Sequence, residues 1–391
     1  MKRYYLFVLG IFLAIFNASA QNDSTEKITL SGYIKFLQTV SFSGLDTFAD
    51  PLTNNLIHNR LNFRYFPNDH WTVAVEARNR IFYGEQVRFT PNYGDLIDQY
   101  NGLVDLSVRW HEGDAILVHS IIDRAYVDYS SGKWEARVGR QRINWGVNLV
   151  WNPNDLFNAF NFLDFDYEER PGSDAVRVTY YPGVLSSAEV AFAPAKNIEE
   201  SVGAAMYKFN ARGYDVQVLG GYYKGDLALG TGWAGNLGQI GFKGEATWFV
   251  PMAPSPDSVQ SLGVSATADY LFGNGIYLSG AFLYNSAGKA GGLGGSGGLF
   301  NSNLTVSAKN LFPVEWAFVA QGSGSITPLF SASGVVIYSP QNNLVAGIPT
   351  LTYSIKENWD IDLVGQLFFM EVQNDFRSLA ASLFFRIKLS F

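Results

Sequence analysis

Residues 379–391, at the end of the chain, read Leu-Ala-Ala-Ser-Leu-Phe-Phe-Arg-Ile-Lys-Leu-Ser-Phe and decide the fold. Large apolar side chains occupy every second position: Leu383, Phe385, Ile387, Leu389 and Phe391. Polar side chains stand between them: Arg386, Lys388 and Ser390. Alternation with a period of two is typical of a β-strand that has one apolar and one polar face. The chain therefore ends in a strand whose apolar face requires an apolar environment.

The same unit, about ten alternating residues and then a turn, recurs back along the chain. Strands are expected near 28–40, 56–66, 71–83, 120–130, 133–142, 173–181, 185–193, 201–210, 214–223, 225–233, 237–249, 260–272, 276–285, 312–323, 326–338, 344–355, 359–371 and 378–391. In a transmembrane barrel, lipid-facing and lumen-facing residues alternate in this way. The pattern predicts an all-β fold, a transmembrane antiparallel up-and-down β-barrel of about 16 to 18 strands with a long inward-folding or capping loop.

The connections between these strands support the count. Short turns, such as Ala211-Arg212-Gly213, fall at one end of an up-and-down barrel, and the long connections fall at the other end. The long connections are 84–119, 143–172 and 286–311. The turns and the long connections fall at opposite ends only if the weak segment 225–233 is a strand. A count of 16 strands remains possible if two weak segments are loops. A barrel of this size encloses an aqueous channel, whereas eight strands are filled by their own side chains.

The composition excludes several other classes of protein. The chain has 391 residues, of which 47% are hydrophobic, 15% aromatic and only 16% charged, against about 25% charged in average globular proteins. Intrinsic disorder requires the opposite balance. After residue 20 no run of about 18 apolar residues occurs, which excludes a helical membrane protein. The chain contains no Cys, which excludes a disulfide-stabilised secreted domain.

The first 20 residues have the pattern of a secretory signal peptide. Lys2 and Arg3 precede the apolar segment 4–16, and Ala18-Ser19-Ala20 is a cleavage site of the A-x-A type. We expect residues 1–20 to be removed, residues 21–27 to form a short periplasmic tail, and residues 28–391 to form the barrel.

A signal peptide combined with a final strand that ends on Phe resembles the outer-membrane barrels of Gram-negative bacteria. The resemblance implies a place in the cell outer membrane and assigns Phe385 and Phe391 to the signal that the barrel-assembly machinery recognises. The segment Arg137-x-Gly139-Arg140-Gln141-x-Ile143-x-Trp145-Gly146 is similar to a strand-to-loop motif of porin-like and alginate-export-like outer-membrane barrels. This second resemblance covers a small part of the chain and does not fix a substrate.

The loop 143–172 follows this motif and is longer than ordinary connections. Its aromatic side chains, such as Trp151, would each forfeit roughly 1.5–3 kcal/mol on a wet surface. One interpretation is a constriction loop folded into the barrel, and the other is an outer cap packed on its own aromatic residues. We expect a helix to start at Asn154 or Asp155, because both are suitable N-cap residues.

Charged side chains on the strands are expected to point into the pore, since each costs about 2–4 kcal/mol when it faces lipid at the midplane. The residues expected to line the pore or its constriction are Arg60, Arg64, Glu76, Arg78, Arg80, Arg124, Asp128, Arg137, Arg140, Arg177, Asp164, Asp166, Glu168 and Glu169. The Arg residues come from the strands between 56 and 181, whereas the strands at 260–272 and 276–285 carry almost no charge. One wall of the barrel is therefore rich in Arg.

Two interpretations of the Arg wall remain open. Rings of Arg and Lys favour anions, so the wall can select anionic or polar solutes. Alternatively, the Arg side chains pair with the acidic residues of the loop, Asp174 included, and fix the loop in place. Both can hold, because opposed charges across a constriction create a transverse field. Calcium binding is disfavoured, because Asp164-x-Asp166-x-Glu168 lacks the glycine and the terminal glutamate of an EF-hand.

Aromatic residues near the strand ends are expected to form the girdles that mark the two membrane interfaces. These residues are Tyr33, Tyr65, Trp71, Tyr83, Trp248, Trp316 and Trp359. The alternative is that they are ordinary aromatic residues of a core.

No sequence pattern indicates an enzyme, a metal site or a cofactor. The His residues show no zinc-binding spacing: His58, His70, His111 and His119. The glycine-rich segment 292–298 formally matches a dinucleotide motif and a nucleophile elbow, but it lacks the strand–turn–helix context that both require. Nucleic-acid binding is disfavoured because the chain is acidic, with a formal net charge of −7.

The sequence thus predicts a porin-like outer-membrane channel for passive diffusion of small polar or anionic solutes, constricted by the loop 143–172 and the Arg wall. Its expected partners are outer-membrane lipid, the barrel-assembly machinery, the solutes themselves, and further copies or other outer-membrane proteins. The alternative is a plugged barrel that serves as a structural or accessory subunit of a multi-protein outer-membrane complex. In that case the low-charge segment 214–285 would face another protein.

Overall fold

The computed structural model describes residues 27–45, 51–98, 102–159, 166, 172–253, 259–288 and 306–391. Nineteen strands form one antiparallel sheet within these ranges. They are β1 (Ile28–Phe42), β2 (Leu52–Asn68), β3 (Trp71–Tyr83), β4 (Ser107–Gly113), β5 (Ile116–Ser131), β6 (Trp134–Gln141), β7 (Ser173–Gly183), β8 (Ser186–Ala193), β9 (Val202–Ala211), β10 (Tyr214–Tyr223), β11 (Asp226–Leu237), β12 (Ile240–Pro251), β13 (Ser261–Leu271), β14 (Tyr277–Asn285), β15 (Trp316–Thr327), β16 (Phe330–Ser339), β17 (Leu344–Lys356), β18 (Trp359–Val372) and β19 (Asp375–Ser390). The helical segments are α2 (Glu85–Phe89), α3 (Tyr93–Ile97), η2 (Ile198–Glu200) and η3 (Pro340–Asn342). No helix in these ranges is long and apolar enough to cross a membrane.

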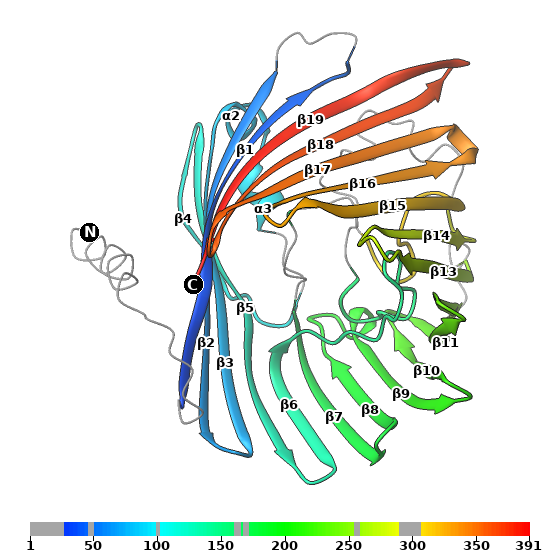
Figure 1. Ribbon diagram of the computed structural model, residues 1–391. Helices are drawn as coiled ribbons and strands as arrows, with labels where there is room; N and C mark the ends of the chain where they lie inside the picture. Colours follow the sequence, from blue (N-terminus) through cyan, green and yellow to red (C-terminus); the bar gives the residue numbers. More distant parts are fainter. Residues whose placement is uncertain are drawn as a thin grey trace, which may run out of the picture.

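Eighteen of the described strands close into an up-and-down barrel, in which neighbours along the chain are neighbours in the sheet (Figure 1). The first and last strands complete the ring, because β1 pairs with β19 from Tyr33↔Ser390 onward. Beside this pairing, Gly32 and Phe391 exchange two backbone hydrogen bonds, of 2.8 and 2.9 Å. The predicted fold class is confirmed, and the strand count is the upper value of the expected range.

The strand β4 is an addition to the ring that the sequence pattern did not reveal. β3 pairs directly with β5 along its whole length. On the other edge of β5, β6 pairs only from Ala125 to Ser131, and β4 pairs with the part of β5 that precedes Ile122. The sequence of β4 is largely polar and its side chains are mostly exposed. It therefore lacks the alternation of apolar residues that identified the other strands.

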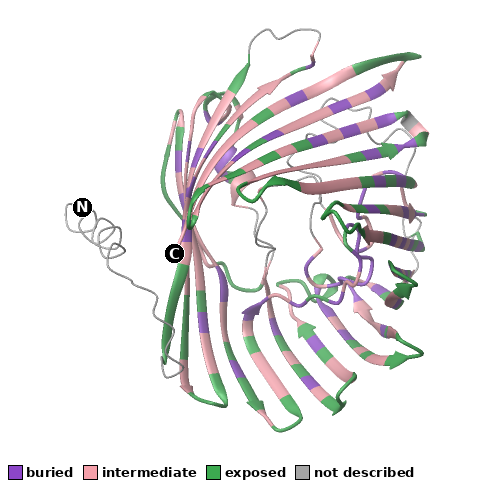
Figure 2. Cartoon of the chain, viewed as in Figure 1, coloured by how far each residue is buried: buried purple, intermediate pink, exposed green. Residues whose placement is uncertain are grey.

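The two faces of the strands differ as a membrane barrel requires. Apolar side chains such as Val127, Val138 and Val190 are exposed, whereas the residues that bear the ion pairs and pack on the inserted segments are buried. Figure 2 shows buried and exposed residues alternating along the strands. An apolar outer band of this kind is the surface that a barrel presents to lipid, so the protein is an outer-membrane barrel. Tyr33 does not belong to the predicted girdles. It is only 5% exposed, because it shares the inner face of β1 with Lys35.

Three connections fold back into the barrel rather than away from it. The helices α2 and α3 pack on the inner faces of β1, β2, β3 and β5 through Val87 and Tyr93. Part of the loop between β6 and β7 packs on the opposite side of the lumen, together with residues 308–314 from the connection before β15. In Figure 1, α3 and the segment after β6 appear inside the ring of strands. The hydrophobic contacts of the barrel therefore lie between its wall and these inserted segments.

Candidate functional site in the barrel interior

Residues 143–159, here termed the constriction segment, form the described first part of the loop 143–172 and lie inside the barrel. Its large apolar residues are almost completely buried: Ile143, Trp145, Val150, Trp151 and Leu156. They pack in two clusters on inward residues of β7 to β12 and of β14 to β18. Figure 2 shows the segment as a buried stretch within the ring. The inward interpretation is therefore confirmed for residues 143–159, and for these residues the outer cap is wrong.

Glu245 on β12 holds the constriction segment against this wall. Its side chain belongs to a residue with 0% exposure, and its carboxylate accepts the backbone N–H groups of Val147, Asn148 and Asn154. The bonds from Asn148 and Asn154 measure 2.8 and 3.0 Å. Charge-assisted bonds of this kind are roughly twice as strong as neutral ones. A single carboxylate therefore fixes two turns of the segment at once.

The helix expected from Asn154 or Asp155 is absent, because the backbone of this region bonds elsewhere. The N–H of Asp155 donates to the carbonyl of Asn152 at 3.1 Å, which closes a turn, and the N–H of Asn154 is taken by Glu245. The Asn154 side chain, which would have to cap a helix by accepting one of its first backbone N–H groups, instead donates to the carbonyl of Thr231 at 3.0 Å and accepts from the hydroxyl of Thr247 at 2.6 Å. The local preference of Asn154 for an N-cap position is therefore overridden by its contacts with Glu245 and Thr247 of β12, about ninety residues later in the chain.

Further polar contacts support the same arrangement. Gln217 donates to the carbonyl of Trp145 at 2.7 Å, and the indole N–H of Trp145 donates to Glu189 at 2.5 Å. Ser265 donates to the carbonyl of Trp151 at 2.8 Å. These three polar side chains point inward from β8, β10 and β13 and bind the segment to the inner wall of the barrel. The low-charge wall is thus the wall that the constriction segment covers.

A second part of the loop reaches β1 and β19. Asp166 accepts a hydrogen bond from the ammonium of Lys35 at 2.7 Å and from the guanidinium of Arg386 at 3.2 Å. Arg386 also pairs with Asp362 on β18 at 2.9 Å. The side chain of Lys35 is fully buried. The loop is therefore tied to both sides of the barrel. Asp164, Glu168 and Glu169 lie outside the described residues.

Asp123 is the centre of the Arg wall, and sequence reasoning missed it. Its carboxylate binds Arg60 at 2.8 Å and Arg78 at 2.6 Å, and Arg60 also pairs with Glu76 at 2.6 Å. The side chains of Arg60 and Asp123 are 1% and 3% exposed. The charges of the two guanidinium groups are therefore partly balanced by a carboxylate that they share.

A bulge in β5 explains why the alternation misplaced Asp123. In the pairing of β3 with β5, Glu76 faces Arg124 and Ala77 faces Ile122, so Asp123 has no partner residue. An extra residue in one strand lets two successive side chains turn to the same face. Asp123 and Arg124 are consequently both buried inside the barrel. A strict period of two that points Arg124 and Asp128 inward would instead turn Asp123 toward lipid.

The other predicted Arg residues also lie on the inner wall, mostly in ion pairs. Arg137 binds Asp128 at 2.7 Å, and Arg140 binds Asp174 at 2.8 Å. The pairs of Arg177 with Glu135 and of Arg64 with Glu76 complete the wall, the latter at 3.7 Å with Arg64 half exposed. Gly139 precedes Arg140 with φ of 117°, a conformation that favours glycine, and this turns Arg140 inward.

The top of the Arg wall is tied to the inserted helices. Arg80 bonds His119 at 3.0 Å, and His119 bonds Asp98, the residue that follows α3, at 3.1 Å. Burial raises the pKa of the Asp98 carboxyl, but hydrogen bonds from Ser107, His119 and Arg109 outweigh burial and lower the pKa to about 2. Asp98 is therefore ionised at neutral pH and fixes α3 to the wall. Among the described residues, no group of three His, Cys, Asp or Glu side chains is placed to hold a metal ion.

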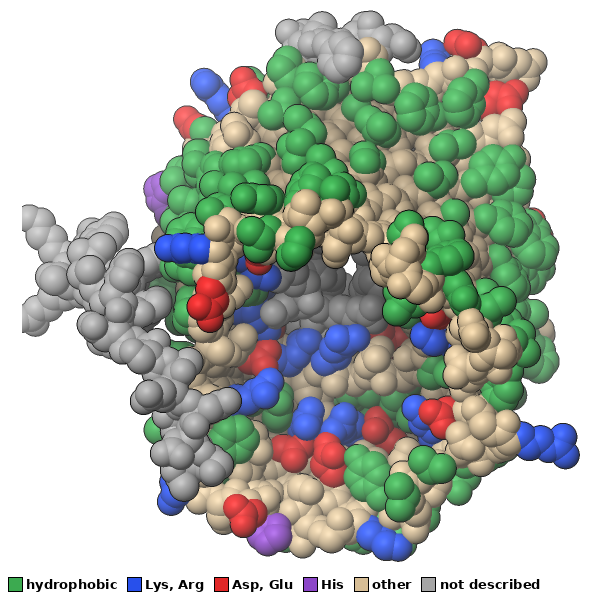
Figure 3. Space-filling view, viewed as in Figure 1, with side chains coloured by type: hydrophobic (Ala, Val, Ile, Leu, Met, Phe, Trp, Pro, Cys, Tyr) green, Lys and Arg blue, Asp and Glu red, His purple; other side chains and the backbone are tan. Residues whose placement is uncertain are grey.

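The interior is thus divided into two different walls. The constriction segment packs on the inner faces of β7 to β12 and of β14 to β18. The Arg wall lies on β2 to β7, with α2 and α3 packed beside it. Figure 3 shows the hollowed centre of the molecule, with Lys, Arg, Asp and Glu side chains gathered inside it and hydrophobic side chains outside.

Solved outer-membrane porins are similar to this barrel. The crystal structure of the outer membrane protein OprD from Pseudomonas aeruginosa has a TM-score of 0.59 and 8% identity, over 94% of this chain and 94% of that one. OccK11 (OpdR) from the same organism has a TM-score of 0.57 and 8% identity, over 93% and 96%. OccAB4 from Acinetobacter baumannii has a TM-score of 0.55 and 8% identity, over 94% and 100%.

No protein-family model and no curated protein sequence matches the chain. At such low identity, the likeness to the porins establishes the fold. The chain has the fold of an outer-membrane porin.

Proposed function

We propose that the chain is a porin-like channel through which small polar or anionic solutes diffuse passively across the outer membrane. The observation that carries the proposal is the position of the constriction segment. Glu245 holds it against the low-charge wall, so the route past it runs along the Arg wall. The finer residue roles follow from this route: the Arg wall sets the charge preference, and the constriction segment sets the size limit.

The inward charges of β1, β2 and β3 favour anions on this route. Their cations are Lys35, Arg60, Arg64, Arg78 and Arg80, and Glu76 is the acid among the inward residues of these strands. Further balancing carboxylates come from elsewhere: Asp123 lies on β5, and Asp166 comes from the loop. On these three strands the cations outnumber the carboxylates that pair with them, and such a wall favours anions over cations.

The decisive experiment is single-channel recording of the folded protein in a planar bilayer with a KCl gradient across it. We expect stepwise conductance and a reversal potential on the Cl⁻ side of zero. A reversal potential on the K⁺ side would contradict the assignment of the Arg wall. The absence of steps from protein that is folded, as judged by its shifted mobility on an unheated gel, would contradict the open channel altogether.

The alternative is a plugged barrel that acts as a structural or accessory subunit, and one observation favours it. The lumen receives three inserted segments, and the link from Asp166 to Lys35 and Arg386 ties the loop to the side opposite the constriction segment. In that case the folded protein is silent in the bilayer. Co-purification of stoichiometric outer-membrane proteins would then be the expected result, and recovery of the barrel alone would argue against it.

Asp166→Asn tests whether the loop contact limits conduction. The substitution removes a carboxylate that balances Lys35 and Arg386, so we expect a higher conductance and a several-fold larger ratio of Cl⁻ to K⁺ permeability. The matched control is Asp360→Asn, which removes an inward carboxylate of β18 that accepts a hydrogen bond from Ser354. Equal changes in conductance and in the ratio of Cl⁻ to K⁺ permeability in the two variants would show that the contact of Asp166 with Lys35 and Arg386 does not limit conduction.

A further inference from the structure

Residues 306–314, in the connection between β14 and β15, lie inside the barrel beside the constriction segment, and we call them the strap. Ser307 and Asn310 of the strap form an antiparallel bridge, in which their backbone groups exchange two hydrogen bonds of 3.1 and 3.0 Å. The bridge closes a tight turn that contains Lys309. Lys309 is the one charged residue of the strap. The strap therefore presents a single cation, and it does so at the turn.

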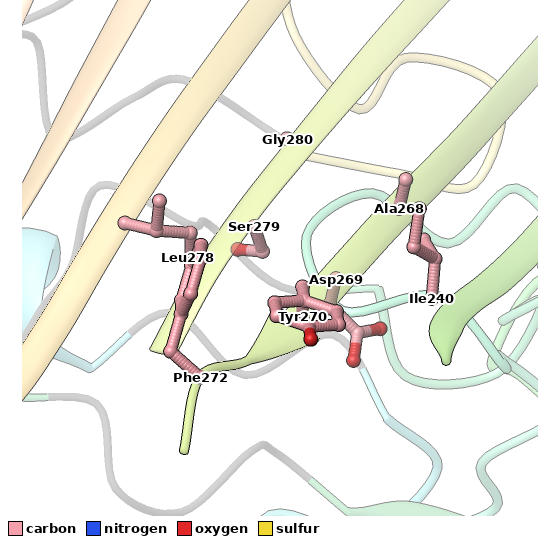
Figure 4. A pocket seen from close by; sticks show the side chains of 8 residues that line it. All are labelled: Ile240, Ala268, Asp269, Tyr270, Phe272, Leu278, Ser279 and Gly280. Carbon is pink, nitrogen blue, oxygen red and sulfur yellow. The ribbon is translucent and has the colours of Figure 1, made fainter. Parts of the chain in front are cut away.

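Polar side chains on the inward side of β13 and β14 hold the strap. Asn285, the last residue of β14, donates to the carbonyl of Phe312 and to the side chain of Asn310, both at 3.1 Å. Ser261, the first residue of β13, donates to the carbonyl of Lys309 at 3.4 Å. The outward side of β12 to β14 carries mainly apolar side chains, five of which Figure 4 shows: Ile240, Ala268, Tyr270, Phe272 and Leu278. The polar contacts thus fix the strap to the lumen side of the sheet.

The turn of the strap reaches past β13 to two further strands. The Nζ atom of Lys309 lies 2.7 Å from a carboxylate oxygen of Asp226, the first residue of β11. Tyr223, the last residue of β10, forms hydrogen bonds through its hydroxyl to the side chain of Ser307 and to the backbone of Ala308. Asp226 is 7% exposed and Tyr223 is 3% exposed. Since β10 and β11 are separated from β14 by β12 and β13 in the ring, the strap crosses the inner side of the low-charge wall.

The strap belongs to both hydrophobic clusters that bury the constriction segment. Ala308 lies in the cluster that contains Trp145. Phe312 lies in the cluster that contains Trp151, and the centroids of these two rings are 6.1 Å apart. The constriction segment thus has two supports. Glu245 of the barrel wall binds its backbone N–H groups, and the strap packs against its aromatic side chains.

We propose that the ion pair of Lys309 with Asp226 is a latch that positions the strap and, through it, the constriction segment. The pair joins the turn of the strap to β11, whereas Asn285 binds the part of the strap nearer its own strands. Loss of Lys309 leaves the nearly buried Asp226 carboxylate without this cation, which favours movement of the turn away from β11. Lys309 and Asp226 are positioning residues, because they act through the strap. The effect of the latch on conduction rests on the proposed channel function, whereas its hold on the constriction segment does not.

Hydrogen–deuterium exchange of the folded protein in detergent, read by mass spectrometry, tests the latch without requiring a conducting channel. The reporter is the peptide 147–154, which contains the backbone N–H groups that Glu245 accepts. We expect Lys309→Met and Asp226→Asn each to raise its exchange rate several-fold. The double variant should exchange no faster than either single variant, because both substitutions remove the same pair. Unheated gels verify that each barrel is folded, and Asp226→Asn keeps the volume of the side chain that it replaces.

Lys224→Gln is the matched control. It removes the same charge from the same rim of the barrel, two residues before Asp226, but the ion pair of Lys224 is with Glu200, at 4.0 Å. Its peptide 147–154 should exchange as slowly as that of the wild type. The latch is overturned if Lys309→Met and Lys224→Gln exchange at equal rates, or if the effects of the two single substitutions add in the double variant.

Single-channel recording then separates the latch from the channel. Lys309→Met should switch between conductance levels several-fold more often than the wild type, because the constriction segment has lost one of its supports. Unchanged switching in a conducting Lys309→Met barrel would overturn the effect of the latch on conduction. A silent wild type, together with faster exchange in Lys309→Met, would contradict the channel and support the latch.

Discussion

Glu245→Ala is expected to raise the single-channel conductance several-fold and to broaden the range of solutes that pass. The carboxylate of Glu245 accepts three backbone N–H groups of the constriction segment. Each buried donor left without a partner costs about 1–3 kcal/mol, so the segment should leave the low-charge wall or become disordered within the lumen. Conductance, and the uptake of neutral sugars of increasing size into liposomes, measure the effect.

Glu245→Gln is the informative companion to this variant. The amide keeps one oxygen acceptor for the N–H groups, but its NH₂ group opposes the remaining donor, so an intermediate conductance is expected. Lys243→Gln is the control, because Lys243 lies on the same face of β12 and pairs with Asp269 rather than with the segment. Wild-type conductance in Glu245→Ala would show that the constriction segment does not depend on Glu245 for its position.

Asp123→Asn is expected to cause the largest loss of barrel stability among the Arg-wall variants, together with stronger anion selectivity. The carboxylate serves both Arg60 and Arg78, and it is nearly inaccessible to solvent. Removing one partner of a buried ion pair costs about 3–5 kcal/mol, because the remaining charge is left uncompensated. The temperature at which the folded band is lost on unheated gels measures stability, and the reversal potential measures selectivity.

Asp128→Asn is the matched control for this experiment. Asp128 is also an inward acid of β5, but among the described residues its ion pair is with Arg137 alone, and Arg137 has Glu135 as a second partner. A smaller loss of stability is therefore expected. If Asp123→Asn and Asp128→Asn behave alike in both measurements, the shared carboxylate is not the centre of the wall.

The sequence was sufficient to predict the barrel because its pattern is local. Apolar alternation in segments such as 378–391 and 359–371 depends only on neighbouring residues and on the contrast between lipid and water. All eighteen ring strands overlap the predicted segments. The sequence pattern did not reveal β4 because that strand is largely polar and has no apolar alternation. It did not reveal α2 and α3 because a helix of five residues is too short to show a helical period.

The interior was harder to predict because its contacts are distant in sequence. That the Arg residues lie inside follows from the cost of charge in lipid, and this holds for Arg60, Arg78 and Arg140. The identity of their partners does not follow, since Asp123 depends on a bulge and Lys35 meets Asp166 across 131 residues. The only clue to the role of Glu245 in the sequence is that it is the one acid of an otherwise mostly apolar strand. A buried acid needs a partner, but its position does not say which partner.

The closure of the ring through β1 and β19 has a consequence for the biogenesis of the protein. A chain that lacks its final strand exposes the open edges of β1 and β18, and such edges promote aggregation. One edge of β1 therefore stays unpaired until β19 is available to pair with it. The ring can therefore close only after β19 has been synthesised, and until then a binding protein that covers the strand edges would protect the chain.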